Sequence, residues 1–232
     1  MTASISQASA APNPSAAPAA PTLRISEIFA SIQGESTRVG LPTVFVRLTG
    51  CPLRCSWCDT SYAFSGGETR SFDHILAEVA RHGLSHVCVS GGEPLAQKNC
   101  LPLLSALCDA GYQVSLETSG ALDISTVDPR VSRVVDLKAP GSGEVERNLY
   151  RNIEHLRASD EVKIVIADAA DYAWARQQLE QHALAERCTV LFSPVAGALS
   201  PTTLAEWIVA DRLPVRFQLQ LHKILWDDAR GR

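Results

Sequence analysis

The stretch Cys51-Pro-Leu-Arg-Cys55-Ser-Trp-Cys58-Asp-Thr60 holds three cysteines at C-x3-C-x2-C spacing, directly after an apolar run typical of a β-strand. Thiolates hold iron–sulfur clusters, and three of them can bind three irons of a four-iron cubane. No fourth cysteine lies nearby, so the fourth iron would be open to another ligand, as in a catalytic metal site. A zinc site is the alternative, but it needs a fourth Cys or His close by, and the nearest histidine, His74, falls in an expected helix.

The composition is that of an ordinary globular protein. The chain has 232 residues, of which 46% are hydrophobic and 20% charged, values that suit one domain with a real core. A net charge of −4 indicates no broad basic face for nucleic acid. Seven cysteines, an odd number, and the lack of a secretory signal favour the reducing cytoplasm. No apolar run is long enough to span a membrane.

Residues 1–22 are almost entirely Ala, Ser, Pro and Thr, without charge, so they are expected to form a disordered tail. Residues 23–232 are expected to form a single domain. Strands are expected over residues 23–29, 44–49, 86–90, 113–117, 131–137, 161–166, 189–192 and 215–222. Helices are expected between Ser71 and Gly83, over 97–110, for about fifteen residues after Asp168, and from Pro201.

This alternation of strands and helices implies parallel strands with right-handed crossovers. The chain is shorter than the roughly 250 residues of a closed eight-unit barrel, and some connections are too short for a helix. We therefore predict an α/β fold in the form of an open, partial TIM barrel with about six parallel strands and a reduced set of helices.

Polar residues fall at the same end of five expected strands. In parallel α/β folds the C-terminal edge of the sheet is where sites are built, so these residues are expected to share one pocket. They are Cys51, Ser90, Glu117, Lys138 and Ser193.

Three further features each have two interpretations. The turn Gly91-Gly92-Glu93 would suit a ligand ammonium group, although taken alone it is an ordinary turn. Arg47, the only charge in its apolar strand, either reaches the surface or awaits an anion in a pocket. The polar turn Gln33-Gly-Glu35 is either a solvated loop or part of a site.

The three-cysteine motif, followed by Ser90-Gly-Gly-Glu-Pro94 at the end of the next parallel strand, resembles the radical S-adenosylmethionine (SAM) enzymes. The resemblance implies a 4Fe-4S cluster on Cys51, Cys55 and Cys58 whose free iron binds the amine and carboxylate of SAM. It also implies a partial TIM barrel and cleavage of SAM to methionine and a 5′-deoxyadenosyl radical, which abstracts a hydrogen atom from the substrate.

Further segments between residues 24 and 232 narrow the resemblance to the 7-carboxy-7-deazaguanine synthase family. They are Glu27–Glu35, Phe45–Cys51, Cys55–Thr60, Glu117–Gly120, Asp136–Gly143 and Gln218–Lys223. The resemblance implies ring contraction of 6-carboxy-5,6,7,8-tetrahydropterin to 7-carboxy-7-deazaguanine with loss of ammonia, a step towards queuosine and related deazapurines. SAM is regenerated in this reaction. The resemblance further implies Mg²⁺, a homodimer and an electron donor such as flavodoxin.

The same resemblance implies roles for individual residues. Substrate ligands would be Gln33, Gly34, Glu35, Ser90 and Arg47, with the guanidinium of Arg47 on the substrate carboxylate. Thr60 would bind Mg²⁺ through its hydroxyl; otherwise it is a turn hydroxyl. SAM would be held by Gly92, Glu93, Ser119, Lys138, Ser142 and Ser193.

Two positions depart from the family pattern: Arg232 stands where an apolar last residue is expected, and Ser36 stands where the family often has glycine.

Two rival functions remain. A glycyl-radical-enzyme activase shares the cysteine loop and the Gly-Gly-Glu-Pro turn, but the Gln33-Gly-Glu35 turn and Arg47 argue against it. A non-catalytic zinc or iron–sulfur module would leave the other polar strand ends without a purpose. The remaining cysteines are expected to be buried apolar residues: Cys88, Cys100, Cys108 and Cys188.

Overall fold

The computed structural model describes residues 20–227 and 229–232. Within these ranges nine strands form one sheet in the order β3-β1-β2-β4-β5-β6-β7-β8-β9. The strands are β1 (Thr22–Ile32), β2 (Pro42–Leu48), β3 (Glu68–Ser71), β4 (His86–Gly91), β5 (Gln113–Thr118), β6 (Ser132–Asp136), β7 (Glu161–Ile166), β8 (Thr189–Pro194) and β9 (Arg216–Phe217). Most of the expected tail, residues 1–19, lies outside the described residues, and Thr22, placed in that tail, is already part of β1.

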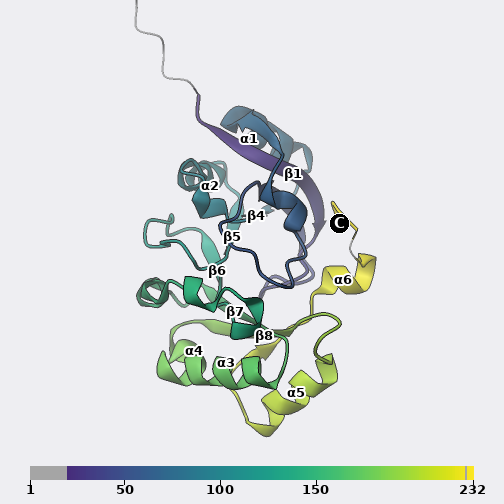
Figure 1. Ribbon diagram of the computed structural model, residues 1–232. Helices are drawn as coiled ribbons and strands as arrows, with labels where there is room; N and C mark the ends of the chain where they lie inside the picture. The colour runs from purple at the N-terminus through teal and green to yellow at the C-terminus, as the bar shows by residue number, and fades with distance from the viewer. Residues whose placement is uncertain (1–19, 228) are drawn as a thin grey trace, which may run out of the picture.

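The helices are α1 (Phe72–Arg81), α2 (Cys100–Asp109), α3 (Ala169–Gln181), α4 (Leu184–Arg187), α5 (Pro201–Ala210) and α6 (Leu221–Trp226). Short 3-10 helices are η1 (Ser61–Phe64), η2 (Pro94–Ala96), η3 (Pro140–Ser142), η4 (Val145–Arg147) and η5 (Tyr150–His155). Every neighbouring pair from β2 and β4 through to β9 is parallel, whereas β1 is antiparallel to both β2 and β3. The sheet curves with α1 to α5 on its outer side and stays open where α6 lies (Figure 1). The prediction of a partial barrel is confirmed.

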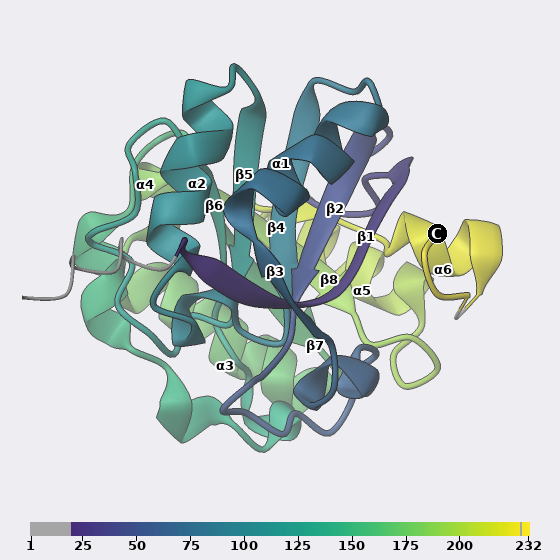
Figure 2. The ribbon, with the colours of Figure 1, turned by 90° about the horizontal axis from the view of Figure 1, so that it is seen from above.

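Two apolar clusters pack the helices onto the outer side of the sheet. The first joins the N-terminal strands to α1 and α2, which cover β4 and β5 (Figure 2). The second joins β7 and β8 to α3 and α5 around Phe192 and Tyr172. The expected N-caps are present: the side chain of Ser71 accepts a hydrogen bond from the His74 amide, and that of Asp168 accepts one from the Asp171 amide.

The expected burial of the remaining cysteines is confirmed for Cys88, Cys100 and Cys188. Burial raises the pKa of Cys100 to about 12 and that of Cys188 to about 11, so these thiols behave as small apolar groups. Cys108 is only partly buried, at the edge of the first apolar cluster.

A buried ion pair joins β6 to the start of β7. A terminal nitrogen of Arg133 lies 2.5 Å from a carboxylate oxygen of Asp160, and the two side chains are 3% and 0% exposed. Asp160 also accepts a hydrogen bond from the Arg157 amide at 2.8 Å. Burial opposes the charge on Asp160, but the hydrogen bonds from Arg133 and Arg157 prevail and lower its pKa. This pair lies at the N-terminal ends of β6 and β7, the opposite edge of the sheet from the polar strand ends, so it stabilises the fold and is not part of the site.

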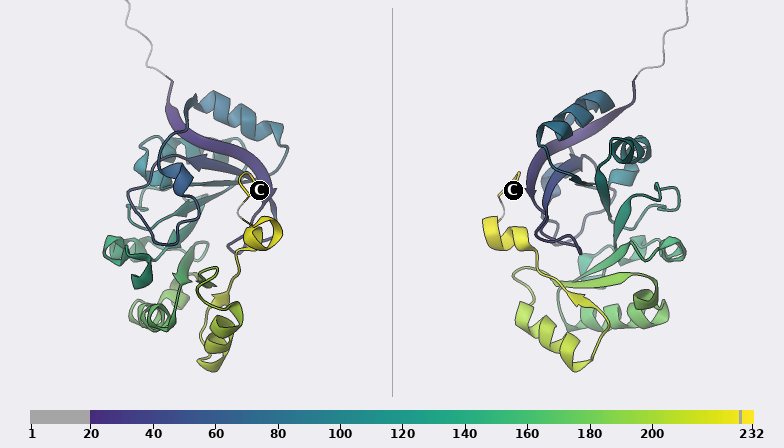
Figure 3. Two further views of the ribbon diagram at one scale, coloured as in Figure 1. Left: turned by 45° about the vertical axis from the view of Figure 1, so that its right-hand side comes forward. Right: turned by 180° about the vertical axis from the view of Figure 1, so that it is seen from behind.

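The last strand differs from the prediction. Instead of running over 215–222, the strand is limited to Arg216–Phe217, and the chain then turns into α6. The side-chain amide of Gln218 donates to the Ser36 carbonyl oxygen and the Leu221 amide donates to that of Gly34, both at 3.0 Å. These bonds draw the chain out of the sheet towards the loop after β1, so that α6 lies beside the end of β1 (Figure 3).

Candidate active site

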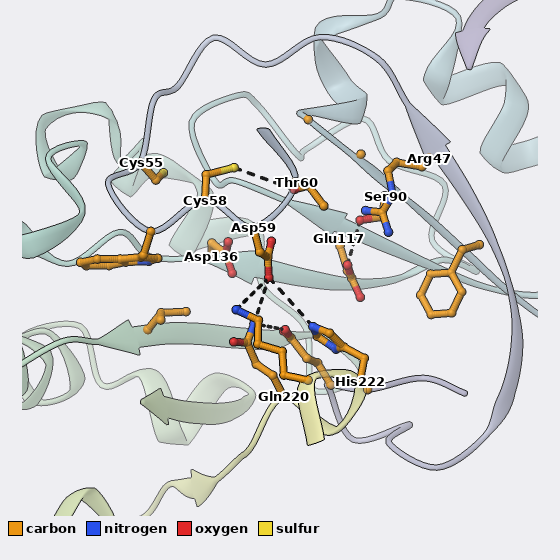
Figure 4. Close-up of a pocket in the computed structure, with 18 of the residues that line it drawn as sticks. Arg47, Cys55, Cys58, Asp59, Thr60, Ser90, Glu117, Asp136, Gln220 and His222 are labelled. Carbon is orange, nitrogen blue, oxygen red and sulfur yellow. Dashed lines mark hydrogen bonds and ion pairs between the residues drawn. The ribbon is translucent and has the colours of Figure 1, made fainter. Parts of the chain in front are cut away.

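A cavity of about 520 Å³ opens at the C-terminal ends of the parallel strands. Its walls come from the loop after β1, the cysteine loop, the ends of β4, β5, β6 and β7, and the C-terminal segment (Figure 4). Twelve of the fifteen residues with an expected ligand role line it: Gln33, Gly34, Glu35, Arg47, Cys51, Cys55, Cys58, Thr60, Ser90, Gly92, Ser119 and Lys138.

The cysteine loop is held in place by hydrogen bonds between protein groups. The Gly50 amide donates to the Ala63 carbonyl oxygen at 2.8 Å, and the Ser56 amide donates to that of Ser142 at 3.0 Å. Gly92 packs against the base of this loop so closely that an added Cβ would lie 2.2 Å from the Gly50 carbonyl oxygen. Only glycine can occupy this position, which is a physical reason for the Gly-Gly turn.

The three thiols of this loop line the cavity and are partly exposed. No three His, Cys, Asp or Glu side chains of the described residues converge on one ion, as a zinc site would require. A cubane binds each thiolate through a different iron, so three separate thiols facing one cavity fit it. Burial raises the pKa of Cys51 and of Cys55.

One edge of the Arg47 guanidinium is fixed by a hydrogen bond to Glu27. Its Nε donates to Glu27 at 2.7 Å, and the Tyr62 hydroxyl donates to the same carboxylate oxygen at 2.8 Å. The guanidinium carbon lies 5.7 Å from the centre of the Phe29 ring and 5.9 Å from that of Tyr62. Burial opposes the charge, but Tyr62 and Glu27 prevail and raise the pKa of Arg47. Among the described residues no group accepts a hydrogen bond from its two terminal nitrogens, so they are available to a ligand.

Glu117 of β5 brings together two of the expected substrate residues. It accepts a hydrogen bond from the Gln33 side chain at 3.2 Å and one from the Ser90 hydroxyl at 2.9 Å. Gln33 in turn accepts from the Glu35 amide at 3.1 Å. The loop after β1 is therefore ordered against the strand ends and is not a freely solvated turn.

Four charged side chains form a chain of ion pairs across the floor of the cavity. Lys163 contacts Glu35 at 2.5 Å and Asp136 at 3.3 Å, and Lys138 contacts Asp136 at 2.5 Å. Burial alone would raise the pKa of both carboxyl groups, but the neighbouring ammonium groups lower it. Both carboxylates are therefore ionised and paired.

The C-terminal segment closes one side of the cavity. Gln220 donates to Glu35 at 2.8 Å, and His222 and Lys223 lie 3.9 and 3.5 Å from Asp59, next to the last cysteine (Figure 4). A Cβ on Gly34 would lie 2.4 Å from the His222 ring, so glycine is needed there for close approach. These residues belong to the segment Gln218–Lys223 of the family resemblance, but no role was predicted for them because their contacts are with segments far away in the chain.

Three expected SAM ligands, Glu93, Ser142 and Ser193, do not line the cavity, and their contact with SAM stays a prediction. Glu93 is fully buried and accepts hydrogen bonds from Thr118, the Ser119 amide and the Leu95 amide. The Ser142 hydroxyl is buried and donates to the Ala139 carbonyl oxygen at 2.6 Å. The Ser193 hydroxyl is buried without a hydrogen-bond partner among the described residues. Glu93 instead fixes the backbone of the neighbouring strand end.

Comparison with known proteins places this geometry in a family. Residues 45–137 match the model of the Radical SAM superfamily. A 7-carboxy-7-deazaguanine synthase from Chlorobaculum tepidum is 49% identical over 214 residues, which cover 90% of this chain and 97% of that protein. The chain belongs to the 7-carboxy-7-deazaguanine synthase family. The family's enzyme from Koribacter versatilis is 42% identical, covering 88% of this chain and 97% of its own length.

Solved structures agree with this family. QueE from Escherichia coli has a TM-score of 0.72 and 26% identity, covering 87% of this chain and 95% of its own. Streptococcus suis SuiB, with 12% identity and a TM-score of 0.55, shares the fold alone. As a family member the protein is a radical SAM lyase that uses a 4Fe-4S cluster and SAM, so the activase and the non-catalytic module are set aside. No described helix is long and apolar enough to cross a membrane.

Proposed function

We propose that the protein converts 6-carboxy-5,6,7,8-tetrahydropterin to 7-carboxy-7-deazaguanine with loss of ammonia, a step in queuosine and deazapurine biosynthesis. The observation that carries this proposal is the free guanidinium edge of Arg47 in the cavity that also holds the three cysteine thiols. The substrate and product both carry a carboxylate, and a guanidinium binds that group through two parallel hydrogen bonds. The pyrimidinone part of a pterin needs both donors and acceptors, which Gln33, Glu35 and Ser90 offer.

The cluster on Cys51, Cys55 and Cys58, when loaded and reduced with SAM bound, supplies the radical that removes a hydrogen atom from the substrate. The protein's own part is to bind and orient. Gly92, Lys138 and Ser119 line the cavity and would hold SAM there. Arg47 would fix the substrate carboxylate and so orient the carbon that loses the hydrogen atom.

We further propose that Thr60 binds Mg²⁺ through its hydroxyl. Its oxygen lies 3.9 Å from the Cys58 sulfur, a weak interaction that leaves the oxygen able to bind a cation. Mg²⁺ takes oxygen ligands and keeps several waters, so one hydroxyl with substrate oxygens is a suitable set.

The proposal includes a cytoplasmic homodimer, a single domain over 23–232, and an electron donor such as flavodoxin. The uninterrupted sheet supports one domain. The exposed apolar residues Val209, Ile224 and Leu225 support a contact with a second copy. A net charge of −4 favours neither nucleic acid nor an anionic membrane surface as a partner.

Anaerobic turnover tests the proposal. The cluster is reconstituted, SAM, dithionite, Mg²⁺ and 6-carboxy-5,6,7,8-tetrahydropterin are added, and products are followed by mass and by ammonia release. The expected result is the deazapurine carboxylate with one ammonia released per product, at a lower rate without Mg²⁺. SAM cleavage with the pterin untouched would reject the substrate, and an unchanged rate without Mg²⁺ would reject the role of Thr60.

A further inference from the structure

Lys163 lines the cavity and joins two parts of the site through its ion pairs. It is the only charged residue inside the apolar run of β7, and it pairs in register with Asp136 of β6. Its ammonium group contacts Glu35 at 2.5 Å and Asp136 at 3.3 Å, and its side chain is 13% exposed. Burial opposes its charge, but Asp136 and Glu35 prevail and raise the pKa of Lys163 well above its usual value. One buried ammonium therefore joins two carboxylates from distant segments.

The two carboxylates belong to different ends of the site. Glu35 stands in the loop of expected substrate ligands, and its other oxygen accepts a hydrogen bond from Gln220 at 2.8 Å. The other oxygen of Asp136 is held at 2.5 Å by Lys138, which lines the cavity together with Cys55. A continuous series of contacts thus runs from Gln220 of the C-terminal segment to Lys138, with Lys163 as its central member.

We propose that Lys163 is a positioning residue that fixes Glu35, and through it the substrate, at a set spacing from the Asp136–Lys138 pair beside the cluster and SAM. This inference rests on the proposed function. Without the ammonium group, two carboxylates would face each other across a partly buried gap, and their repulsion would turn Glu35 away from its position. Lys138 would still hold Asp136, so the SAM end would stay assembled while the substrate end moved.

Loss of the Lys163 ammonium group is expected to uncouple SAM cleavage from product formation, and not to unfold the protein. A displacement of about 1 Å between reacting groups is enough to reduce a rate about 100-fold. A 5′-deoxyadenosyl radical formed while the substrate carbon is out of reach takes its hydrogen atom from another C–H bond, such as one of a buffer molecule. 5′-Deoxyadenosine and methionine are then released in place of regenerated SAM, and dithionite must supply another electron for the next cleavage. We therefore expect Lys163→Met to weaken substrate binding about 10- to 100-fold, the range typical when a residue that holds a ligating side chain is lost. The ratio of 5′-deoxyadenosine to product should rise as well.

Two variants separate positioning from a purely structural role. Lys163→Arg keeps the charge, so it should recover part of the substrate affinity that the methionine variant loses. Arg157→Met is the matched control, because it also removes a cation from an aspartate ion pair, at the opposite edge of the sheet, while Arg133 still pairs with Asp160. The control should lower the melting temperature without changing substrate affinity or the product ratio.

The measurements are the Kd of the pterin for reconstituted, unreduced enzyme with SAM bound, and the ratio of 5′-deoxyadenosine to deazapurine during turnover. Melting temperature and cluster absorbance establish that each variant is folded and loaded. A folded Lys163→Met protein with the wild-type Kd and the wild-type ratio would overturn the inference. If the methionine variant does not fold, Lys163→Gln is used in its place, and the same results are expected or would overturn the inference. Wild-type enzyme that makes no deazapurine would instead reject the proposed function.

Discussion

Replacing Arg47 with methionine is the sharpest test of how the cavity holds its substrate. The Nε edge of the guanidinium is used by Glu27, and Tyr62 donates to the same carboxylate oxygen. The two terminal nitrogens are therefore directed by protein contacts towards a ligand, and their bonds to a substrate carboxylate are what Arg47→Met removes. SAM binding should not change, since no expected SAM ligand contacts Arg47.

The size of the effect follows from the number and kind of bonds lost. A hydrogen bond to a charged group contributes about 1.5–3 kcal/mol, and two are lost. The lower end of that range, about 1.5 kcal/mol for each bond, applies because the Arg47 side chain is 14% exposed and its bonds compete with water. The expected loss is about 3 kcal/mol, which corresponds to a Kd increase of about 150-fold.

The assay is anaerobic titration of the pterin into reconstituted, unreduced enzyme with SAM bound. A second variant, Arg47→Met with Glu27→Gln, separates two causes of weaker binding. If the loss comes from the missing hydrogen bonds, the double variant binds as poorly as the single one. If it comes from the unpaired Glu27 carboxylate repelling the substrate, the double variant regains affinity. A single-variant Kd within about threefold of wild type, under 1 kcal/mol, would refute the reasoning.

Three other substitutions test the rest of the account. Cys55→Ala should abolish cluster absorbance and turnover together, and turnover by a cluster-free variant would contradict the chemistry. Gly92→Ala should reduce cluster loading, because its Cβ would lie 2.2 Å from the Gly50 carbonyl oxygen; iron content equal to wild type would argue against this packing. Asp160→Asn should lower the free energy of unfolding in urea by about 3 kcal/mol. Since the folded pKa of Asp160 is depressed, wild-type stability should also fall as pH drops from about 4 through that pKa, and the variant should lack this part of the fall.

The sequence was a good guide where local patterns decide the structure. Strands β4 to β8 lie where apolar runs end in polar residues, and α1 begins at the Ser71 cap with its apolar face buried. Arg47 lies in the apolar strand β2, and the cysteine motif follows the end of that strand. Both therefore line the cavity at the C-terminal ends of the strands. Lys163 carries a signal similar to that of Arg47, a charge with apolar neighbours in its strand, and could have been found by it.

The rest depends on contacts between distant segments, which local patterns do not record. The segment after Phe217 alternates like a strand, yet bonds from Gln218 and Leu221 to the loop after β1 turn it away from the sheet. Ser193 stands at the expected strand end, but the direction of its side chain places the hydroxyl in the interior. The edge strand β3 is short and polar and gains its form from pairing with β1.

The loop that carries the cysteines has a further consequence, for how the enzyme matures. Its shape is set by backbone hydrogen bonds at Gly50 and Ser56, neither of which involves a cysteine side chain. Zinc fingers, by contrast, have no fold until the metal binds. Because these bonds do not depend on the thiols, we expect the loop to keep its shape when the cluster is lost. Oxygen damage should then leave a folded protein that can accept a new cluster, and not an unfolded chain.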